Sequence, residues 1–419
     1  MLAEFLYWLI PYQIFKSVFF RAGLTYLTTY FLINLFIPKI IRLFRQKGIT
    51  SDFKVAENSK GPYSGATPIM GGIILIPAIV ISTILWAWLN KYTISLLVII
   101  SSFAFIGGID DIMKVFHKRK IEAGVGQKEK YIDKADGISG KIRLLFEFSI
   151  TSIVIIGIYY FSNGLENYLV IPGIPIANWH PEIPVMLFVP FIILVIVVGA
   201  NAVNLTDGLD SLAAVPIITC SVFIASAAYI AGDPEWSERL RISFITSDIK
   251  EVTIFAIAII AACIAFLKFN SPPASIYMGD IGSLGFGASI CTMFIFVRSE
   301  FYLPIVGWVF VLAAVSSIIQ RIWFKVAMWK KGRNWAEKNR FFYKAPYHHH
   351  LQEMMEYREE KPDIRSIWHE CMIKIGMGHI SDENKYKQRD HINNKVIWTH
   401  HLRAVSLLVI AMVIYFKLR

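Results

Sequence analysis

Cysteine is scarce in this chain, and its distribution excludes two classes of protein. Only four cysteines occur among the 419 residues, three inside apolar blocks and Cys371 in a charged segment. No pair has the spacing of a secreted disulfide framework or of a thiolate metal site. The cysteines are therefore interpreted as structural or inert.

The start of the chain lacks the features of a secreted precursor. The first twenty residues include Trp8, Pro11, Tyr12 and Lys16, without a basic start or a small-residue cleavage site. This argues against a removed signal peptide. We expect residues 1–22 to form an N-terminal segment in the membrane interface.

Charge is also scarce, at 17% of the residues, whereas 55% are hydrophobic and lie in long blocks. This pattern excludes an ordinary soluble protein, because about 20 apolar residues cross a bilayer. It predicts an all-α polytopic membrane protein, with residues 23–419 forming one transmembrane catalytic domain that has a cytoplasmic insertion at about 351–400. The ten expected spans begin near Gly23, Ile69, Thr93, Leu144, Ile183, Leu212, Val252, Ser283, Tyr302 and Leu402.

Lysine and arginine concentrate in the segments that follow the odd-numbered spans. The positive-inside rule places those segments in the cytoplasm and both termini outside. The net charge of +11 reflects this asymmetry and suits anionic lipid and substrate. Between Lys325 and His401, part of the chain is expected to form an interfacial helix around Trp329 and Trp335.

Acidic residues interrupt the apolar pattern at the end of the third span. The motif GGIDDIMKV places Asp110 and Asp111 side by side, with Lys114 one turn later. Carboxylates near a membrane are costly without partners, and magnesium favours such oxygen ligands together with substrate phosphates. The alternative is a solvated helix end with an Asp–Lys pair.

A second polar motif, NAVNLTDGLDSLA, follows the fifth span. Asn204, Asp207 and Asp210 recur every third residue, so in a helix they would share one face suited to a nucleoside or a metal-bound water. Gly208 permits a break in that helix. The alternative is plain helix capping.

A third motif, NSPPASIYMGDIGSLG, follows the seventh span. Pro272 and Pro273 end the helix, and Asp280 lies between Gly279 and Gly282, where backbone can approach a ligand. This placement indicates a metal ligand or a base. The alternative is a turn aspartate that caps the eighth span.

Histidines and basic residues complete the set. In APYHHHL, the consecutive His348, His349 and His350 diverge too far on a helix to bind one zinc ion, but histidine near phosphate can donate hydrogen bonds or a proton. A surface histidine run is the alternative. Lys60, near TPIMGG, and Lys141, in GISGKIRLL, could neutralise phosphate, whereas Arg143 is interpreted as a membrane anchor.

These motifs follow spans three, five, seven and nine, so they lie on one membrane face whichever way the chain is inserted. Carboxylate, amide, lysine and histidine groups on a basic face predict a magnesium and phosphate site that opens to lipid headgroups. An ion-coupled transporter would instead place its charges near mid-span, and no internal repeat supports that class.

Five motifs resemble, in sequence and order, those of the phospho-N-acetylmuramoyl-pentapeptide transferases, which belong to the polyprenyl-phosphate N-acetylhexosamine-1-phosphate transferase superfamily. They are TPIMGG, GGIDDIMKV, NAVNLTDGLDSLA, NSPPASIYMGDIGSLG and APYHHHL. The resemblance spans roughly residues 22–351 and the last helix. It implies transfer of phospho-N-acetylmuramoyl-pentapeptide from UDP to undecaprenyl phosphate, giving lipid I and UMP. It also implies ten helices, a homodimer and a bacterial cytoplasmic membrane with the site on its inner face.

The resemblance also implies roles for individual residues. Asp280 is similar to the magnesium ligand, and Asp110 and Asp111 to the essential acidic pair, with Asp110 activating the lipid phosphate and Lys114 steadying phosphate. Tyr277 stands where the family usually has Phe and could stack on uracil. The remaining donor contacts by resemblance are Asn204, Asp207, Asp210, Gln320, His348, His349 and His350.

Three departures from the family pattern are visible. Ser64 stands where a lysine is expected, which leaves Lys60 as the nearest basic residue upstream. Ser211 replaces a usual glycine, and the segment between His350 and the last span is longer than expected. The closest alternative function is transfer of N-acetylglucosamine phosphate to the same lipid, and the uninterrupted histidine triplet favours the muramoyl reaction.

Overall fold

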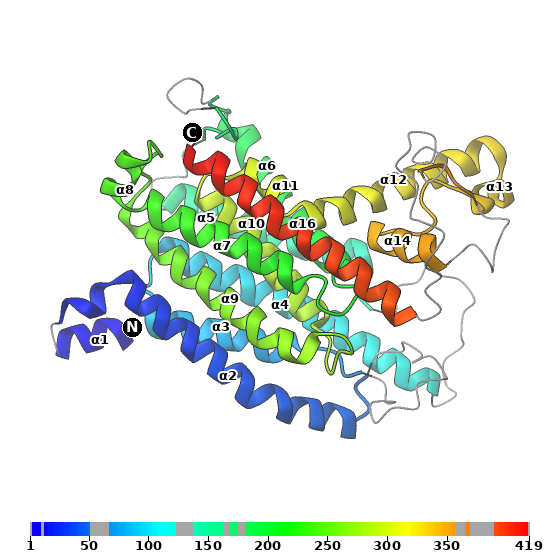
Figure 1. Cartoon of the computed structure of the whole chain (residues 1–419), viewed down its shortest axis with the longest axis horizontal. Coiled ribbons are helices and arrows are strands. Elements are labelled where there is room, and N and C mark those ends of the chain that lie inside the picture. Colours follow the sequence, from blue (N-terminus) through cyan, green and yellow to red (C-terminus); the bar gives the residue numbers. More distant parts are fainter. Residues whose placement is uncertain are drawn as a thin grey trace.

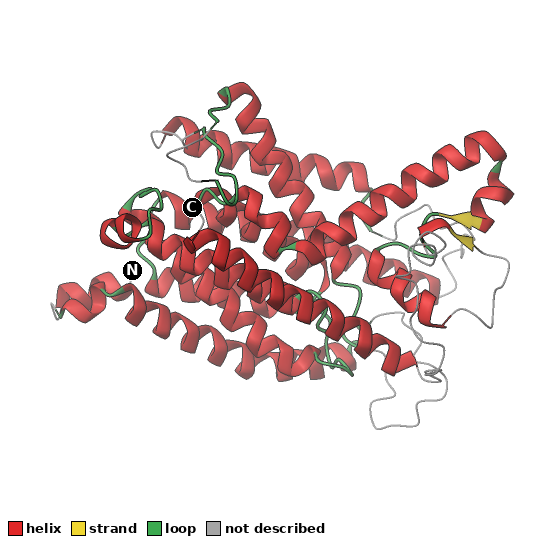
Figure 2. Cartoon of the chain, turned by 45° about the horizontal axis from the view of Figure 1, so that its top comes forward, coloured by secondary structure: helices red, strands yellow, loops and turns green. Residues whose placement is uncertain are grey.

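The protein was analysed as a computed structural model that describes residues 2–9, 12–50, 67–122, 137–161, 167–174, 181–356, 365–368 and 389–417. Helices dominate these residues, and two short parallel strands pair beside them (Figure 2). The elements are α1 (Leu2–Leu9), α2 (Val18–Gln46), α3 (Gly72–Trp86), α4 (Lys91–Glu122), α5 (Gly140–Phe161), α6 (Val185–Thr206), α7 (Ala214–Ala231), α8 (Pro234–Arg239), α9 (Lys250–Asn270), α10 (Gly279–Phe296), α11 (Leu303–Val306), α12 (Trp308–Lys331), α13 (Arg333–Lys338), β1 (Asn339–Arg340), α14 (Tyr347–Glu356), β2 (Arg365–Ser366) and α16 (Arg389–Lys417).

The long apolar helices agree with the membrane spans that were expected from the sequence. Within the described ranges, nine helices are long and apolar enough to cross a bilayer, and α3 is a shorter apolar helix. Together they account for the ten expected segments, so the prediction of an all-α polytopic membrane protein is confirmed. The largest shift in a boundary is at the tenth span, where α16 begins at Arg389 and not near Leu402.

Helix α10 lies at the centre of the bundle and is buried along almost its whole length. It packs against α3, α4, α6 and α7. Glycines permit this close approach, since a methyl group at Gly107 of α4 would collide with the Asp280 carbonyl, and one at Gly72 of α3 with the Gly282 backbone. Small residues at such contacts let helix backbones approach closely in a membrane.

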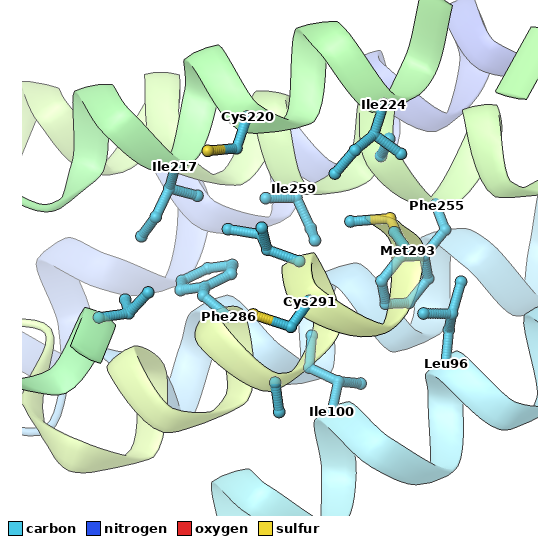
Figure 3. Close-up of a cluster of buried hydrophobic side chains, with 14 of the residues drawn as sticks. Leu96, Ile100, Ile217, Cys220, Ile224, Phe255, Ile259, Phe286, Cys291 and Met293 are labelled. Atoms are coloured by element: carbon cyan, nitrogen blue, oxygen red, sulfur yellow. The ribbon is translucent and has the colours of Figure 1, made fainter. Parts of the chain in front are cut away.

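The apolar core surrounds this central helix. Figure 3 shows Phe286, Cys291 and Met293 of α10 among side chains of α4, α7 and α9. These side chains are fully or almost fully buried. Cys220, Cys263 and Cys291 are buried free thiols, as expected for structural cysteines, while Cys371 lies outside the described residues.

Both termini lie at the end of the bundle opposite α13 (Figure 1). The motifs at the ends of α4, α6 and α9 are joined by hydrogen bonds, and α14, which follows α12, lies against Gly208. The prediction that odd-numbered spans deliver their motifs to one face is therefore confirmed. Lys60 and Ser64 lie outside the described residues.

A buried ion pair joins α2 to α9 at the opposite end. The guanidinium of Arg21 donates two hydrogen bonds of 2.6 Å to Glu251, and the backbone N–H of Trp88 donates to the same carboxylate at 2.8 Å. Arg21 is 1% exposed and lies 4.5 Å from the Trp88 ring. This bidentate geometry fixes the two helices in register.

Replacing Glu251 by Ala is expected to destabilise the protein by about 3 to 5 kcal/mol, because the buried Arg21 charge would lose its partner. Glu235→Ala is the control, since Glu235 pairs with Arg239 where both side chains are more than half exposed; its effect should stay below about 1 kcal/mol. Thermal unfolding in detergent compares the two variants. Equal midpoints would contradict the role given to the buried pair.

Candidate active site

Asp280 is the point at which the motifs meet. It lies in the first turn of α10, where the helix dipole favours a negative charge. Its Oδ1 accepts a hydrogen bond from Asn204 of α6 at 2.7 Å, and its Oδ2 lies 2.9 Å from Nζ of Lys114 of α4 and 3.5 Å from Nη1 of Arg143 of α5. Four helices thus converge on one carboxylate.

Lys114 connects the acidic residues of α4 to Asp280. Its Nζ lies 2.8 Å from Asp110 Oδ2 and 3.9 Å from Asp111 Oδ1. Asp110 and Asp111 are 3% and 4% exposed, and α4 continues beyond them to Glu122. The Asp–Lys pair of the alternative interpretation is therefore present, but its solvated helix end is wrong, because residues 137–138 and α10 cover the two carboxylates.

The two neighbouring aspartates hold different parts of the backbone. Asp110 Oδ1 accepts from the N–H of Ile138 at 2.7 Å, which ties the start of α5 to α4. Asp111 Oδ2 accepts from the N–H of Ile281 at 3.2 Å, at the beginning of α10. Asp111, and not Asp280, therefore satisfies a free N–H at the first turn of that helix.

Arg143 belongs to this cluster, although the sequence suggested a membrane anchor. Its Nη2 donates to Asn201 at 2.8 Å, and its Nε lies 3.4 Å from the fully buried Glu147. Asn201 in turn donates to Glu147 at 2.6 Å. Lys141, which the sequence predicted to neutralise phosphate, is exposed on the first turn of α5.

The segment after α6 is not helical as the three-residue spacing suggested. Helix α6 ends at Thr206, and consecutive turns follow through Ala213, so Asn204, Asp207 and Asp210 do not share a helix face. Asn204 points to Asp280, whereas Asp210 accepts from the N–H of Ala274 at 2.9 Å. The helix has already ended at Thr206 with Asp207 as its C-cap, and Gly208, which the sequence identified as permitting a break, follows directly.

Burial changes the acidity of groups around these turns. The pKa of Asp207 is raised well above its ordinary value, first by burial and then by the negative charges of Asp280 and Asp111. The pKa of Tyr277 is raised to about 12 by burial and by Asp210. Both shifts disfavour a negative charge on these groups, which suits a surface that must accept an anionic ligand.

Two further loops form the floor of the site. The N–H of Tyr277 donates to Pro68 at 2.9 Å, and the N–H of Gly71 donates to Tyr277 at 2.8 Å, so TPIMGG pairs with the loop before α10. Asn270 joins this loop to the turns after α6, because its Oδ1 accepts from Ser211 N–H and its Nδ2 donates to Ile276, at 2.8 and 2.9 Å. Nothing in the sequence motifs singled out this buried asparagine.

Helix α14 carries the three histidines beside Gly208. A methyl group at Gly208 would lie 3.0 Å from Nε2 of His348 and 3.5 Å from Nε2 of His349. His348 and His350 are 2% and 1% exposed, so the interpretation as a surface histidine run is wrong. Burial lowers the pKa of His348 well below its usual value, and its Nε2 has no hydrogen-bond partner among the described residues.

The other contacts around these histidines hold neighbouring backbone segments in place. His350 Nδ1 accepts from the N–H of Tyr343 at 3.2 Å. Gln320, predicted to contact the donor, accepts from the N–H of Phe342 at 2.8 Å and thereby holds the loop that leads into α14. His401 of α16 lies 3.0 Å from the Ser211 carbonyl, a link across 190 residues that sequence reasoning missed.

The residues around Asp280 fit a hard cation only in part. Within the described parts of the chain, no group of three or more His, Cys, Asp or Glu side chains is arranged to hold a metal ion alone. Carboxylate oxygens of Asp110, Asp111 and Asp280 nevertheless gather around the Lys114 ammonium. Oxygen donors in this number suit magnesium when substrate phosphates supply the other ligands.

Gly107→Ala is expected to destabilise the protein by about 2 kcal/mol, because the added methyl group must separate α4 from α10. Gly108→Ala is the matched control: its methyl group would lie 3.5 Å from the Ile281 side chain, which is ordinary contact, and alanine favours a helix. Thermal unfolding in detergent is measured for both. An unimpaired Gly107→Ala variant would contradict the close packing of these helices.

Ser211→Gly is expected to stabilise the protein by about 1 kcal/mol. Ser211 has φ of +58°, a left-handed conformation that costs a side chain roughly this amount and costs glycine little. Ser211→Ala separates the conformational effect from loss of the hydroxyl. If the two variants unfold at the same midpoint, the backbone explanation is wrong.

Residues 93–298 match the model of glycosyl transferase family 4. A phospho-N-acetylmuramoyl-pentapeptide-transferase of Neisseria gonorrhoeae is 33% identical over 359 residues, covering 84% of this chain and 91% of the relative. Proteins of the same name from Pelagibacter ubique and Aquifex aeolicus are 35% and 33% identical, covering 81% and 83% of this chain and 87% and 88% of their own lengths.

Proposed function

The chain belongs to the phospho-N-acetylmuramoyl-pentapeptide transferase family, and we propose that it transfers phospho-N-acetylmuramoyl-pentapeptide from UDP to undecaprenyl phosphate. An oxygen of the lipid phosphate attacks the sugar-bound phosphorus of the donor. The bond between the two donor phosphates breaks, which gives lipid I and UMP. The observation that supports this reaction most directly is the convergence of Lys114, Arg143 and Asn204 on Asp280.

The reaction brings two anions together, so the site must offset their repulsion and hold them in line. Lys114 and Arg143 supply two cations whose nitrogens lie within 3.5 Å of Asp280 Oδ2. Asn204 and Asn201 orient the carboxylate and the guanidinium through their amide groups. These residues can bind and align phosphate oxygens as charge shifts during transfer.

Asp280 is the residue best placed to hold a magnesium ion. Its side chain is 16% exposed, compared with 4% for Asp110 and 5% for Asp111, so it presents the most accessible carboxylate of the three. When bound there, magnesium would neutralise the donor diphosphate. Magnesium dependence is part of the proposal, with Asp110 and Asp111 supporting the site from α4.

Direct attack by the lipid phosphate is favoured over a covalent aspartyl-phosphate. Asp110 and Asp111 each accept a backbone hydrogen bond and are almost fully buried, which leaves little room for an attacking carboxylate. Asp110 remains the candidate that activates the acceptor phosphate. A phosphorylated aspartate recovered from enzyme incubated with donor alone would overturn this preference.

The uridine part of the donor would lie along the turns after α6. Asp207, Asp210 and Tyr277 line this region, and His348 and His349 face Gly208 beside it. Tyr277 offers a half-buried ring for stacking. The site end of the bundle would face the cytoplasm of a bacterial inner membrane, and assembly as a homodimer belongs to the same proposal.

The substrate assignment is tested by assaying the purified protein with undecaprenyl phosphate and each UDP-sugar in turn, with and without magnesium. UMP should be released with UDP-N-acetylmuramoyl-pentapeptide and magnesium, and chelation should abolish release. Release with only the N-acetylglucosamine donor would assign the alternative reaction. Release with neither donor from folded protein would contradict transferase function.

Arg143→Met is expected to reduce turnover about 100-fold, the usual effect of removing one charge-stabilising donor. Lys141→Met provides the matched control two residues away on the same helix, where the side chain is exposed. We expect that variant to keep its turnover within about threefold, as surface charges contribute little. The opposite ranking would return the phosphate-binding role to Lys141.

A further inference from the structure

Helix α5 carries one buried side chain between residues 141 and 149, and it is the carboxylate of Glu147. Its neighbours Phe146 and Phe148 are exposed, as expected for a helix surface that contacts lipid. A charge inside a spanning helix costs about 2.5 to 3.5 kcal/mol at mid-helix depth. A carboxylate at the inward position of this helix therefore indicates a function that an apolar side chain could not serve.

Glu147 forms a closed triangle of polar contacts with Arg143 and Asn201. Its Oε1 lies 3.4 Å from Arg143 Nε, and its Oε2 accepts from Asn201 Nδ2 at 2.6 Å. Oδ1 of Asn201 accepts from Arg143 Nη2 at 2.8 Å. The Asn201 amide also donates to the Val197 carbonyl at 3.0 Å, which fixes it to α6. The third guanidinium nitrogen, Nη1, is directed at Asp280 Oδ2, 3.5 Å away.

The carboxylate of Glu147 determines the direction of the hydrogen bonds in this triangle. An ionised carboxylate can only accept, so Asn201 must present its NH2 group to Glu147. The amide oxygen of Asn201 then faces Arg143, whose guanidinium can only donate. A glutamine at position 147 would leave two donors facing each other whichever way the two amide groups turned.

We infer that Glu147 is a positioning residue, which orients Asn201 and Arg143 so that the guanidinium presents Nη1 to phosphate oxygens of the substrates. The inference rests on the proposed function, because phosphoryl transfer supplies the ligand for that nitrogen. The triangle holds the other two nitrogens of Arg143. The arginine therefore meets its ligand in a fixed orientation, and donors that are fixed in advance stabilise developing charge without reorganisation.

The first experiment exchanges the donor and acceptor groups of the triangle. Glu147→Gln places two donors face to face and Asn201→Asp places two carboxylates face to face, so each is expected to lower kcat about tenfold, with smaller changes in KM for either substrate. The combined variant should return to within about threefold of wild type, because the new amide donates to the new carboxylate and accepts from Arg143.

Ser149→Ala is the matched control on α5, since the Ser149 hydroxyl is exposed and bonds within its own helix. Its kcat should equal that of wild type. Thermal unfolding in detergent verifies that all four variants are folded. A combined variant no more active than Glu147→Gln would overturn the inference.

A second comparison separates positioning from packing. Once Arg143 is replaced by Met, Glu147 has lost its cation, so adding Glu147→Gln should leave the remaining turnover within about twofold and raise the unfolding midpoint. A residue that only packs the helices would lose the same factor in turnover with or without Arg143. Equal losses in the two backgrounds would overturn the positioning role.

The wild-type protein distinguishes failure of this inference from failure of the proposed function. If wild type releases no UMP with any UDP-sugar, the proposed function fails and the inference fails with it. If wild type turns over and Glu147→Gln turns over at the same rate, only the positioning role fails.

Discussion

The close approach of α10 to its neighbours is the constraint on which the rest of the structure depends. Apolar attraction between helices is weak in lipid, so tight van der Waals contact must hold a bundle together. Glycines of α3 and α4 lie directly against the α10 backbone. Because Asp280 is in the first turn of α10, the same packing that stabilises the bundle brings a carboxylate to the lysine, arginine and amide groups of three other helices.

Hydrophobic block length and the parity of the spans were enough to predict the architecture and the common face of the motifs. Both depend on the bilayer, because its thickness sets the length of a helix and because successive spans end at opposite surfaces. The sequence also indicated the aspartates, Lys114 and Asn204 as candidates, because charged and polar groups next to an apolar block are costly without partners. Predicting these features requires no information about which side chains are in contact.

The roles of four residues could not be predicted from the sequence, because each role depends on contacts between segments far apart in the chain. These residues are Arg143, Glu147, Asn201 and Asn270. Arg143 and Lys141 lie on one basic stretch, and only the packing of α5 against α4 and α6 decides which of them turns inward. Asn270 resembles any polar residue at a helix end until Ser211 and Ile276 are placed around it. Local spacing also misled, since the turns after Thr206 ended the helix that the three-residue period suggested.

Helix α9 joins the two ends of the molecule in a way that relates the reaction to the membrane itself. Its first turn holds Glu251, paired with Arg21, and its last residue is Asn270, which fastens two loops of the active site. Its 21 residues span about 32 Å, close to the thickness of a hydrocarbon core. The length of α9 thus sets the depth of the carboxylates around Asp280, and a thinner bilayer must deform around the protein for its surface to reach them.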